Sequence, residues 1–219
     1  MKTDQVRKGL ALGAVALSLA GCMGNGSGGG GGGGGSMSSS DYDTKFAQIE
    51  NLAPTGNMPT SLKANYTGAA KMDLREGDTG DSIGEVMADL DLDVDWTEGQ
   101  TNNVWSGQAT NFRGTMNGDD FTAEGVLEVD PETSTVGRSE STIALPTGGT
   151  QTVASGAMLV HLGGELTVDG TTGQAGMQLG GAFFGDRGRA AIGTAGLGLN
   201  TDGDTSPELV GVGTYYLEQ

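Results

Sequence analysis

The chain has 219 residues and a formal net charge of −17, from 28 acidic and 11 basic side chains. This charge excludes nucleic acid and anionic lipid headgroups as partners, because both repel an acidic surface, and it favours a basic protein or metal cations. The sequence has 2 Trp, 4 Tyr and 5 Phe, too few for the two aromatic girdles of a membrane-spanning β-barrel.

The N-terminal segment has the layout of a secretory signal. A basic stretch, Met1 to Lys8, precedes an apolar run, Gly9 to Leu19, which is too short to span a bilayer. The ending Leu19-Ala20-Gly21-Cys22 resembles the bacterial lipobox, which implies cleavage before Cys22 and lipid on that cysteine. The alternative is an ordinary secreted protein with an unmodified cysteine at its cleavage site. Cys22 is the only cysteine, so no disulfide within the chain is expected.

We expect three segments: a lipoprotein signal peptide at 1–21, a lipidated cysteine with a flexible Gly/Ser tether at 22–45, and a β-barrel domain at 46–219. The unbroken glycine run from Gly28 to Gly35 buries nothing and behaves as a coil. Met23 stands where an Asp retains related lipoproteins in the inner membrane, which favours an outer-membrane anchor. The domain faces either the periplasm or the cell surface.

Hydrophobic spacing distinguishes a short helix from a long series of strands. Phe46, Ile49 and Leu52 predict one or two helical turns before Pro54. After Pro54 the alternation has a period of two and is interrupted by turn signals such as Asn117-Gly118. The predicted strands are 62–75, 86–96, 104–116, 121–129, 140–145, 153–162, 165–169, 177–184, 189–199 and 209–217.

The fold class that follows is all-β: a single antiparallel soluble β-barrel of eight or nine strands after the signal and the tether. Glycines inside the strands favour a closed barrel, because glycine permits bends and close approach of backbones. Charged residues on the outward-facing rows exclude lipid around this barrel, since they would be costly in a bilayer.

A glycine-aromatic motif carries a family resemblance. Gly180-Gly181-Ala182-Phe183-Phe184-Gly185, followed by Ile192-Gly193-Thr194, resembles the barrel lobe of transferrin-binding protein B-like surface lipoproteins. The resemblance implies a lipid-anchored barrel that binds a host or environmental protein or a small solute, in metal or haem acquisition, with an outer-membrane receptor. Asp186 and Ala191 replace a Pro and a Glu of that family. The resemblance therefore predicts the family's fold for this chain but does not predict its ligand.

The motif is expected to be structural, with close backbone packing at Gly180, Gly181, Gly185 and Gly193. Phe183 and Phe184 are adjacent, so on a strand they point to opposite faces. One ring should fill the barrel, and the other should lie on the outer wall or the rim.

The most regular candidate site is a row of four aspartates, Asp89, Asp91, Asp93 and Asp95, on one strand face. Their spacing of about 6.5–7 Å along the strand is too wide for one strand to wrap a calcium ion. The row is either a solvated wall that discourages edge pairing or a docking face for a basic partner.

Three other groups of residues are candidate binding sites, and each also has a purely structural interpretation. Asn200, Asp202 and Asp204 lack the glycine and glutamate positions of a calcium loop, which favours a hairpin turn. The single histidine, His161, is either a wall residue or a ligand for haem iron or a metal. The aromatic residues Trp96, Trp105, Tyr215 and Tyr216 either fill the core or form a binding surface.

No catalytic set of nucleophile, base and orienting group is marked, so we expect a protein that is not an enzyme and has no cofactor beyond the lipid on Cys22. The leading expectation is a surface lipoprotein whose barrel binds a protein or a small solute. The alternatives are a structural or adhesive lipoprotein without a captured solute, and a barrel that encloses a lipid-like ligand.

The anchor can be tested with Cys22→Ala. Without the thiol the chain cannot be lipidated, so the variant should leave the membrane fraction, as measured by fractionation and immunoblotting after a salt wash. A variant that still sediments with membranes would show that the lipobox interpretation is wrong.

Overall fold

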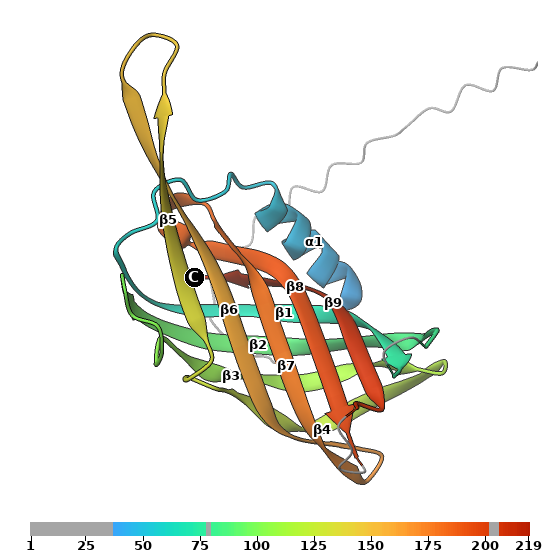
Figure 1. Ribbon diagram of the computed structural model, residues 1–219. Coiled ribbons are helices and arrows are strands. Elements are labelled where there is room, and N and C mark those ends of the chain that lie inside the picture. Colours follow the sequence, from blue (N-terminus) through green and yellow to red (C-terminus); the bar gives the residue numbers. More distant parts are fainter. Residues whose placement is uncertain (1–36, 78–79, 202–205) are drawn as a thin grey trace, which may run out of the picture. The chain divides into compact units, whose positions relative to one another are not determined.

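The computed structural model describes residues 37–77, 80–201 and 206–219. This part of the chain contains one α-helix, α1 (Ser39–Glu50), one short 3-10 helix, η1 (Asp186–Gly188), and nine strands. The strands are β1 (Ser61–Glu76), β2 (Ser82–Thr97), β3 (Trp105–Met116), β4 (Asp119–Val129), β5 (Thr135–Ala144), β6 (Thr150–Val168), β7 (Thr171–Phe184), β8 (Ala190–Asn200) and β9 (Leu209–Glu218). All strand pairings are antiparallel and the sheet closes into a ring (Figure 1), which confirms the predicted all-β barrel class.

The ring closes because β6 pairs with two strands along one edge. Residues 150–159 of β6 face β5, residues 162–168 face β4, and β7 occupies the opposite edge of β6. The ring therefore runs β1-β2-β3-β4-β6-β7-β8-β9 and returns to β1, while β5 is a ninth strand attached to β6. Closure removes the open edges that a flat sheet of the eight ring strands would have, and β5 keeps one unpaired edge.

Two strand predictions are corrected by β6 and β5. The segments 153–162 and 165–169 are one strand, because β6 continues through Gly163 and Gly164 in unbroken register with β7. β5 begins at Thr135, earlier than the predicted 140. Glycine in the middle of a strand pattern predicts an interruption, but in β6 the backbone of Gly163 and Gly164 continues the same ladder.

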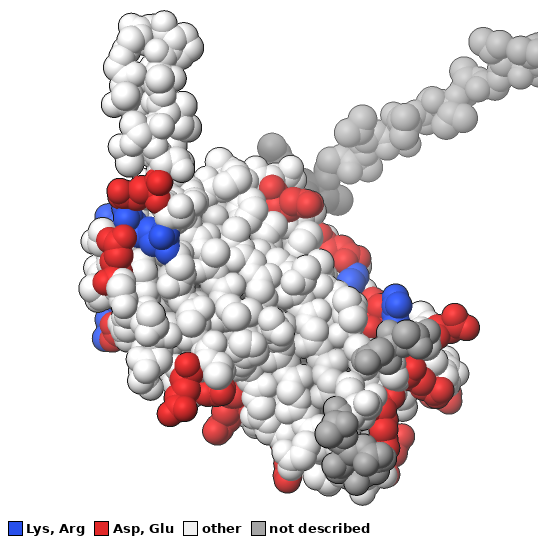
Figure 2. All heavy atoms as spheres, viewed as in Figure 1, with Lys and Arg blue, Asp and Glu red and all other residues white. Residues whose placement is uncertain are grey.

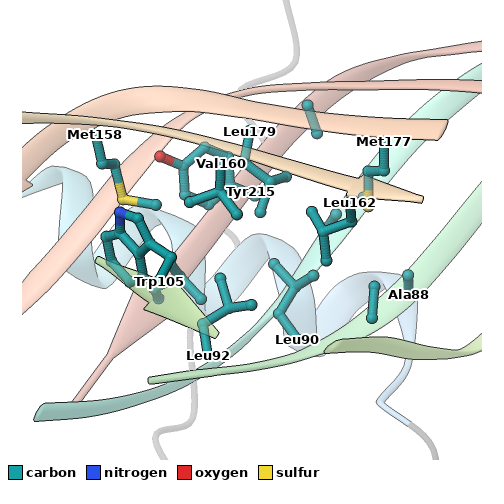
Figure 3. Close-up of a cluster of buried hydrophobic side chains, with 14 of the residues drawn as sticks. Ala88, Leu90, Leu92, Trp105, Met158, Val160, Leu162, Met177, Leu179 and Tyr215 are labelled. Atoms are coloured by element: carbon teal, nitrogen blue, oxygen red, sulfur yellow. The ribbon is translucent and has the colours of Figure 1, made fainter. Parts of the chain in front are cut away.

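The interior of the ring is filled by the inward side chains of the alternating strands. Figure 3 shows Leu90, Leu92, Trp105, Val160, Leu162, Leu179 and Tyr215 meeting there, from five different strands. Each is 3 % exposed or less. Full burial of an aliphatic side chain contributes roughly 1.5–3 kcal/mol, so the alternation seen in the sequence is also the main source of stability.

Helix α1 covers part of the outer wall of the barrel (Figure 1). It begins with a capping box, in which the Asp41 N–H donates to Ser38 Oγ at 3.2 Å and the Ser38 N–H donates to the Asp41 carboxylate. Tyr42 and Ile49 are buried beneath the helix, and the Tyr42 ring lies 5.5 Å from that of Tyr216 on β9. The Tyr42 hydroxyl also lies 2.9 Å from Thr214 Oγ1.

The helix is longer than the spacing of Phe46, Ile49 and Leu52 predicted, and it shifts a domain boundary. The predicted tether extended to residue 45, but α1 begins at Ser39, so the folded domain includes residues assigned to the tether. The predicted signal peptide at 1–21 and the tether up to residue 36 lie outside the described residues. In the described ranges, no helix is long and apolar enough to cross a membrane.

Tyr66 ties the C-terminus to one end of the barrel. Its hydroxyl donates to the Gly188 carbonyl in η1 and accepts a hydrogen bond from Gln219 Nε2 at 2.8 Å. Burial raises the pKa of Tyr66 to about 12, because the phenolate would lose its hydration. The hydroxyl therefore keeps its proton at neutral pH and remains a donor.

The two adjacent phenylalanines divide between the faces of β7, as predicted. Phe183 is 1 % exposed in the core, with its ring centroid 6.2 Å from that of Tyr66. Phe184 is half-buried on the outer wall, against the cluster beneath α1. Gly185 follows with φ +73°, a left-handed conformation that glycine adopts without a steric cost, and it leads into η1.

Glycines on the two faces of the wall differ in what surrounds them. A Cβ on Gly193 would lie 2.0 Å from the Gly180 carbonyl oxygen, and a Cβ on Gly181 would lie 2.5 Å from the Tyr215 hydroxyl. On the outer face of β8, the strand that contains Gly193, a Cβ on Gly196 would meet no heavy atom within 4 Å. Close packing therefore requires glycine at 181 and 193, and no such contact requires it at 196. The expected close packing at Gly180 is wrong, because a Cβ there would come no nearer than 3.8 Å to a neighbouring atom.

Alanine variants of the two phenylalanines should differ in stability. Phe183→Ala should lose about 3–5 kcal/mol of unfolding free energy, because it leaves a cavity in the core. Phe184→Ala should lose much less, because its ring is partly solvated already. Denaturant melts measure both values, and equal small losses would show that neither ring fills the core.

A second matched pair lies on β8. Gly193→Ala should destabilise the fold by about 1–3 kcal/mol through overpacking, while Gly196→Ala should stay within about 0.5 kcal/mol of the parent. The same melts decide the point. If both variants unfold at the same denaturant concentration, the close approach at Gly193 does not affect the free energy of unfolding.

Candidate binding surfaces

The aspartate row lies on the outer wall, where the alternation of β2 placed it. Asp91, Asp93 and Asp95 are exposed and Asp89 is half-buried, while the side chains between them enter the core. Across the ladder, Asp95 faces Lys63 of β1, and Asp93 faces Asn65. The structure therefore brings the four aspartates together with polar groups of the neighbouring strands.

The ends of the row are paired with cations and its centre is not. Lys63 Nζ lies 2.5 Å from Asp95, and Arg113 Nη2 lies 2.9 Å from Asp89. The hydrogen bond to Asp95 raises the pKa of Lys63 above its usual range. In the described part of the chain, the recorded partner of both Asp91 and Asp93 is the Asn65 amide, which lies 2.8 and 3.1 Å from their oxygens and carries no charge.

A shallow depression adjoins this uncompensated centre. It has a volume of about 440 Å³ and is lined by Lys63, Asn65, Asp93, Asp95 and Ser106, with two apolar neighbours. Within residues 37–77, 80–201 and 206–219, no three His, Cys, Asp or Glu side chains are placed to hold a metal ion. The row is thus a charged, hydrated surface whose chemistry suits cationic groups of a partner.

The opposite half of the wall carries almost no charge. β7 and β8 have no Asp, Glu, Lys or Arg, and β9 has only Glu218 near its end, whereas β2 alone has five carboxylates. Figure 2 shows this uncharged face, with acidic groups at its margins. The chain's negative charge is therefore unevenly distributed around the barrel.

His161 lies on this uncharged face, as a wall residue of β6. It is half-buried, its Nδ1 lies 3.2 Å from the Thr133 carbonyl oxygen, and it borders an open groove of about 390 Å³ over β6 to β9. The groove has apolar walls from Val210 and Val212 and a floor of exposed glycine backbone. Among the described residues, the imidazole therefore borders an open surface groove and not an enclosed pocket.

The four aromatic residues in question fill space inside the protein. Trp96, Trp105, Tyr215 and Tyr216 are each 2 % exposed or less, which confirms the core-filling interpretation. Trp105 Nε1 donates to the Thr135 carbonyl at 3.1 Å, which joins the core to the start of β5. Burial raises the pKa of Tyr215 well above its usual range, so this hydroxyl is neutral in the core.

One small cavity lies at one end of the interior. It measures about 30 Å³ and is lined by apolar side chains, among them Leu74, Phe112, Phe121 and Leu199. Ligand pockets are usually about 300–1,000 Å³, and about 10–15 Å³ already accommodates a water molecule. This cavity is therefore large enough for a water molecule and too small for an organic ligand.

Sequence reasoning missed one feature, the projection of the β5–β6 hairpin away from the ring. Its signal is present in the sequence, because no charged residue occurs from Ser141 to Gly164 in an otherwise acidic chain. Cys22 and the residues Asp202 to Asp204 lie outside the described residues, so lipidation stays a prediction and so does the turn at Asn200.

Compared with protein-family models, with curated proteins and with solved structures, this chain gives no match. The resemblance to transferrin-binding protein B-like lipoproteins therefore stays a prediction from the motif around Gly180. The assignment of a barrel fold rests on the observed strand pairing.

Proposed function

We propose that this chain is an outer-membrane-anchored surface lipoprotein whose barrel binds a partner on its outer wall. The acidic row on β2 favours a basic protein as that partner. The wider role suggested by the family resemblance is capture of a protein or small solute in metal or haem acquisition.

The observation that carries this proposal is the uncompensated pair at the centre of the row. Asp91 and Asp93 are exposed and share the neutral Asn65 amide, and Asp93 also lines a surface depression. Carboxylates in this position attract lysine and arginine side chains at long range and speed association. The uncharged wall on β7 and β8 has no comparable attraction.

A second candidate is a structural or adhesive surface lipoprotein without a captured solute. The filled interior favours it over a solute carrier, because a cavity of about 30 Å³ accommodates no organic ligand. An absorbance spectrum and a native mass spectrum of the purified protein separate the two candidates. A retained chromophore or added mass supports solute capture, and its absence supports adhesion.

The docking face can be tested with two double variants of equal net charge. Asp91→Asn with Asp93→Asn removes the central charges, and Asp119→Asn with Asp120→Asn removes two exposed charges from the β3–β4 hairpin. Isothermal titration with an oligolysine peptide at low salt should show about a tenfold larger loss of affinity for the first pair, equal to about 1.4 kcal/mol. Equal losses in both variants would mean that only net charge matters and that the row is no docking face.

A further inference from the structure

The β5–β6 hairpin extends beyond the ring as a two-stranded ribbon, which we call the arm (Ser139–Thr152). Every residue of the arm is exposed, and Figure 1 shows it standing clear of the barrel. Five pairs, from Glu140–Ala154 to Ala144–Thr150, continue the β5–β6 ladder without a register shift. An isolated two-stranded ribbon is marginally stable in water, so an arm of this length is expected to gain order from a partner.

The base of the arm is fixed to the barrel. Arg138, with 10 % of its side chain exposed, donates to the Met58 carbonyl at 2.9 Å and pairs with Glu98 at 3.0 Å and with Glu140. On the other strand, Ala154 exchanges backbone hydrogen bonds with the segment at 56–58. The arm is therefore held at its base on both strands and projects in a defined direction.

The hydrogen bonds of Ala154 also determine which backbone groups of the arm are open. The Ala154 N–H and C=O point away from β5, towards Gly56 and Met58. Along an antiparallel ladder, the backbone N–H and C=O groups of successive residues point to opposite edges of the strand. The backbone groups of Thr152 therefore also point away from β5, and those of its partner Thr142 point away from β6. Among the described residues β5 pairs only with β6, which leaves the N–H and C=O groups of Glu140, Thr142 and Ala144 along an open edge.

Beyond Glu140 at its base, this edge lacks the protections that natural sheets use against pairing. Between Ser141 and Thr152 it has no charged residue, no bulge and no proline within a strand, since Pro146 lies in the turn. Such an edge is a template for another strand. Ile143 and Leu145 lie on one face of the arm and are 53 % and 39 % exposed, two of the few large apolar side chains so exposed in the described residues.

We propose that the arm pairs with the arm of a second copy of this chain, β5 edge against β5 edge, about a two-fold axis at Thr142. In this arrangement Thr142 faces its own counterpart and Glu140 faces Ala144 of the other copy. The contact is isologous, as in most homodimers, and it turns two ribbons into one four-stranded sheet.

The distribution of charge is the reason for proposing a second copy of this chain as the partner of the arm. Each chain has a net charge of −17, so two copies repel each other wherever their acidic walls approach. The arm extends away from those walls, and Figure 2 shows it without charged groups beyond its base, where Glu140 is its only charged residue. The two Glu140 carboxylates would be offset by four residues, about 13 Å, which is beyond the screening length at physiological salt.

Side chains complete the contact on one face of the new sheet. Ile143 would face Ser141 of the other copy, and the two Ile143 side chains would be diagonal neighbours, within reach of each other. Leu145 lies on the same face at the end of each strand. The interface is small, so the association should be weak and concentration-dependent.

The test uses the full chain carrying Cys22→Ala, which removes the only cysteine. Sedimentation over a concentration series should show a monomer–dimer equilibrium. Thr142→Pro removes an N–H from the open β5 edge and should weaken the dimer by about tenfold or more, because two hydrogen bonds across the axis are lost. Thr152→Pro, the matched control, removes the N–H facing the opposite edge of the same arm and should leave dimerisation unchanged.

A cross-linking experiment tests the position of the axis. Thr142→Cys should form a disulfide-linked dimer under mild oxidation, since Cα atoms of a hydrogen-bonded pair lie about 5.5 Å apart, within disulfide range. Thr122→Cys, at an exposed position on β4, should not.

Three results would overturn the proposal. They are a parent that stays monomeric at every concentration, association that survives Thr142→Pro, and equal cross-linking at residues 142 and 122. Phosphatidylcholine vesicles added to a monomeric parent identify the other occupant. Binding that Ile143→Lys abolishes would assign the arm to a lipid surface instead.

Discussion

The fold depends on the way one edge of β6 is shared between two strands. Residues 162–168 pair with β4 and close the ring, while residues 150–159 pair with β5. Because the ring is closed, each of its strands has a hydrogen-bonded neighbour on both sides. The inward side chains of these strands are enclosed and pack against one another. Because the other half of that edge holds β5 and not a ring strand, the hairpin is free to leave the barrel. The same strand therefore produces both the sealed core and the exposed arm.

Packing inside the ring restricts where a partner can bind. Gly181 and Gly193 allow neighbouring backbones and the Tyr215 ring to approach so closely that a Cβ at either position would collide. Aromatic and aliphatic side chains fill the interior around them, and a cavity of about 30 Å³ lies among Leu74, Phe112 and Leu199. A barrel packed in this way supports the side chains of its outer wall, where the charged and polar groups of the described residues lie.

The outer wall has three regions with different chemistry. β2 presents aspartates of which the central two face a neutral amide, and β7 to β9 present glycine, threonine and glutamine with almost no charge. The arm presents open backbone groups and two apolar side chains. Attraction of a basic partner and association of two copies would use separate regions, so one does not obstruct the other.

The sequence by itself determined the local pattern: the alternation of Leu90, Leu92 and Val94 with the aspartates, the turn at Asn117-Gly118, and the opposite directions of Phe183 and Phe184. These follow from the two-residue period of a strand, which depends only on neighbouring residues. Tertiary structure decided what depends on distant residues. It decided that β6 runs through Gly163 and Gly164, that Tyr216 lies beneath α1, and that Arg113 reaches Asp89. It also decided which glycines face a neighbouring backbone and which face open space, because that depends on the curvature of the closed ring and not on any local pattern.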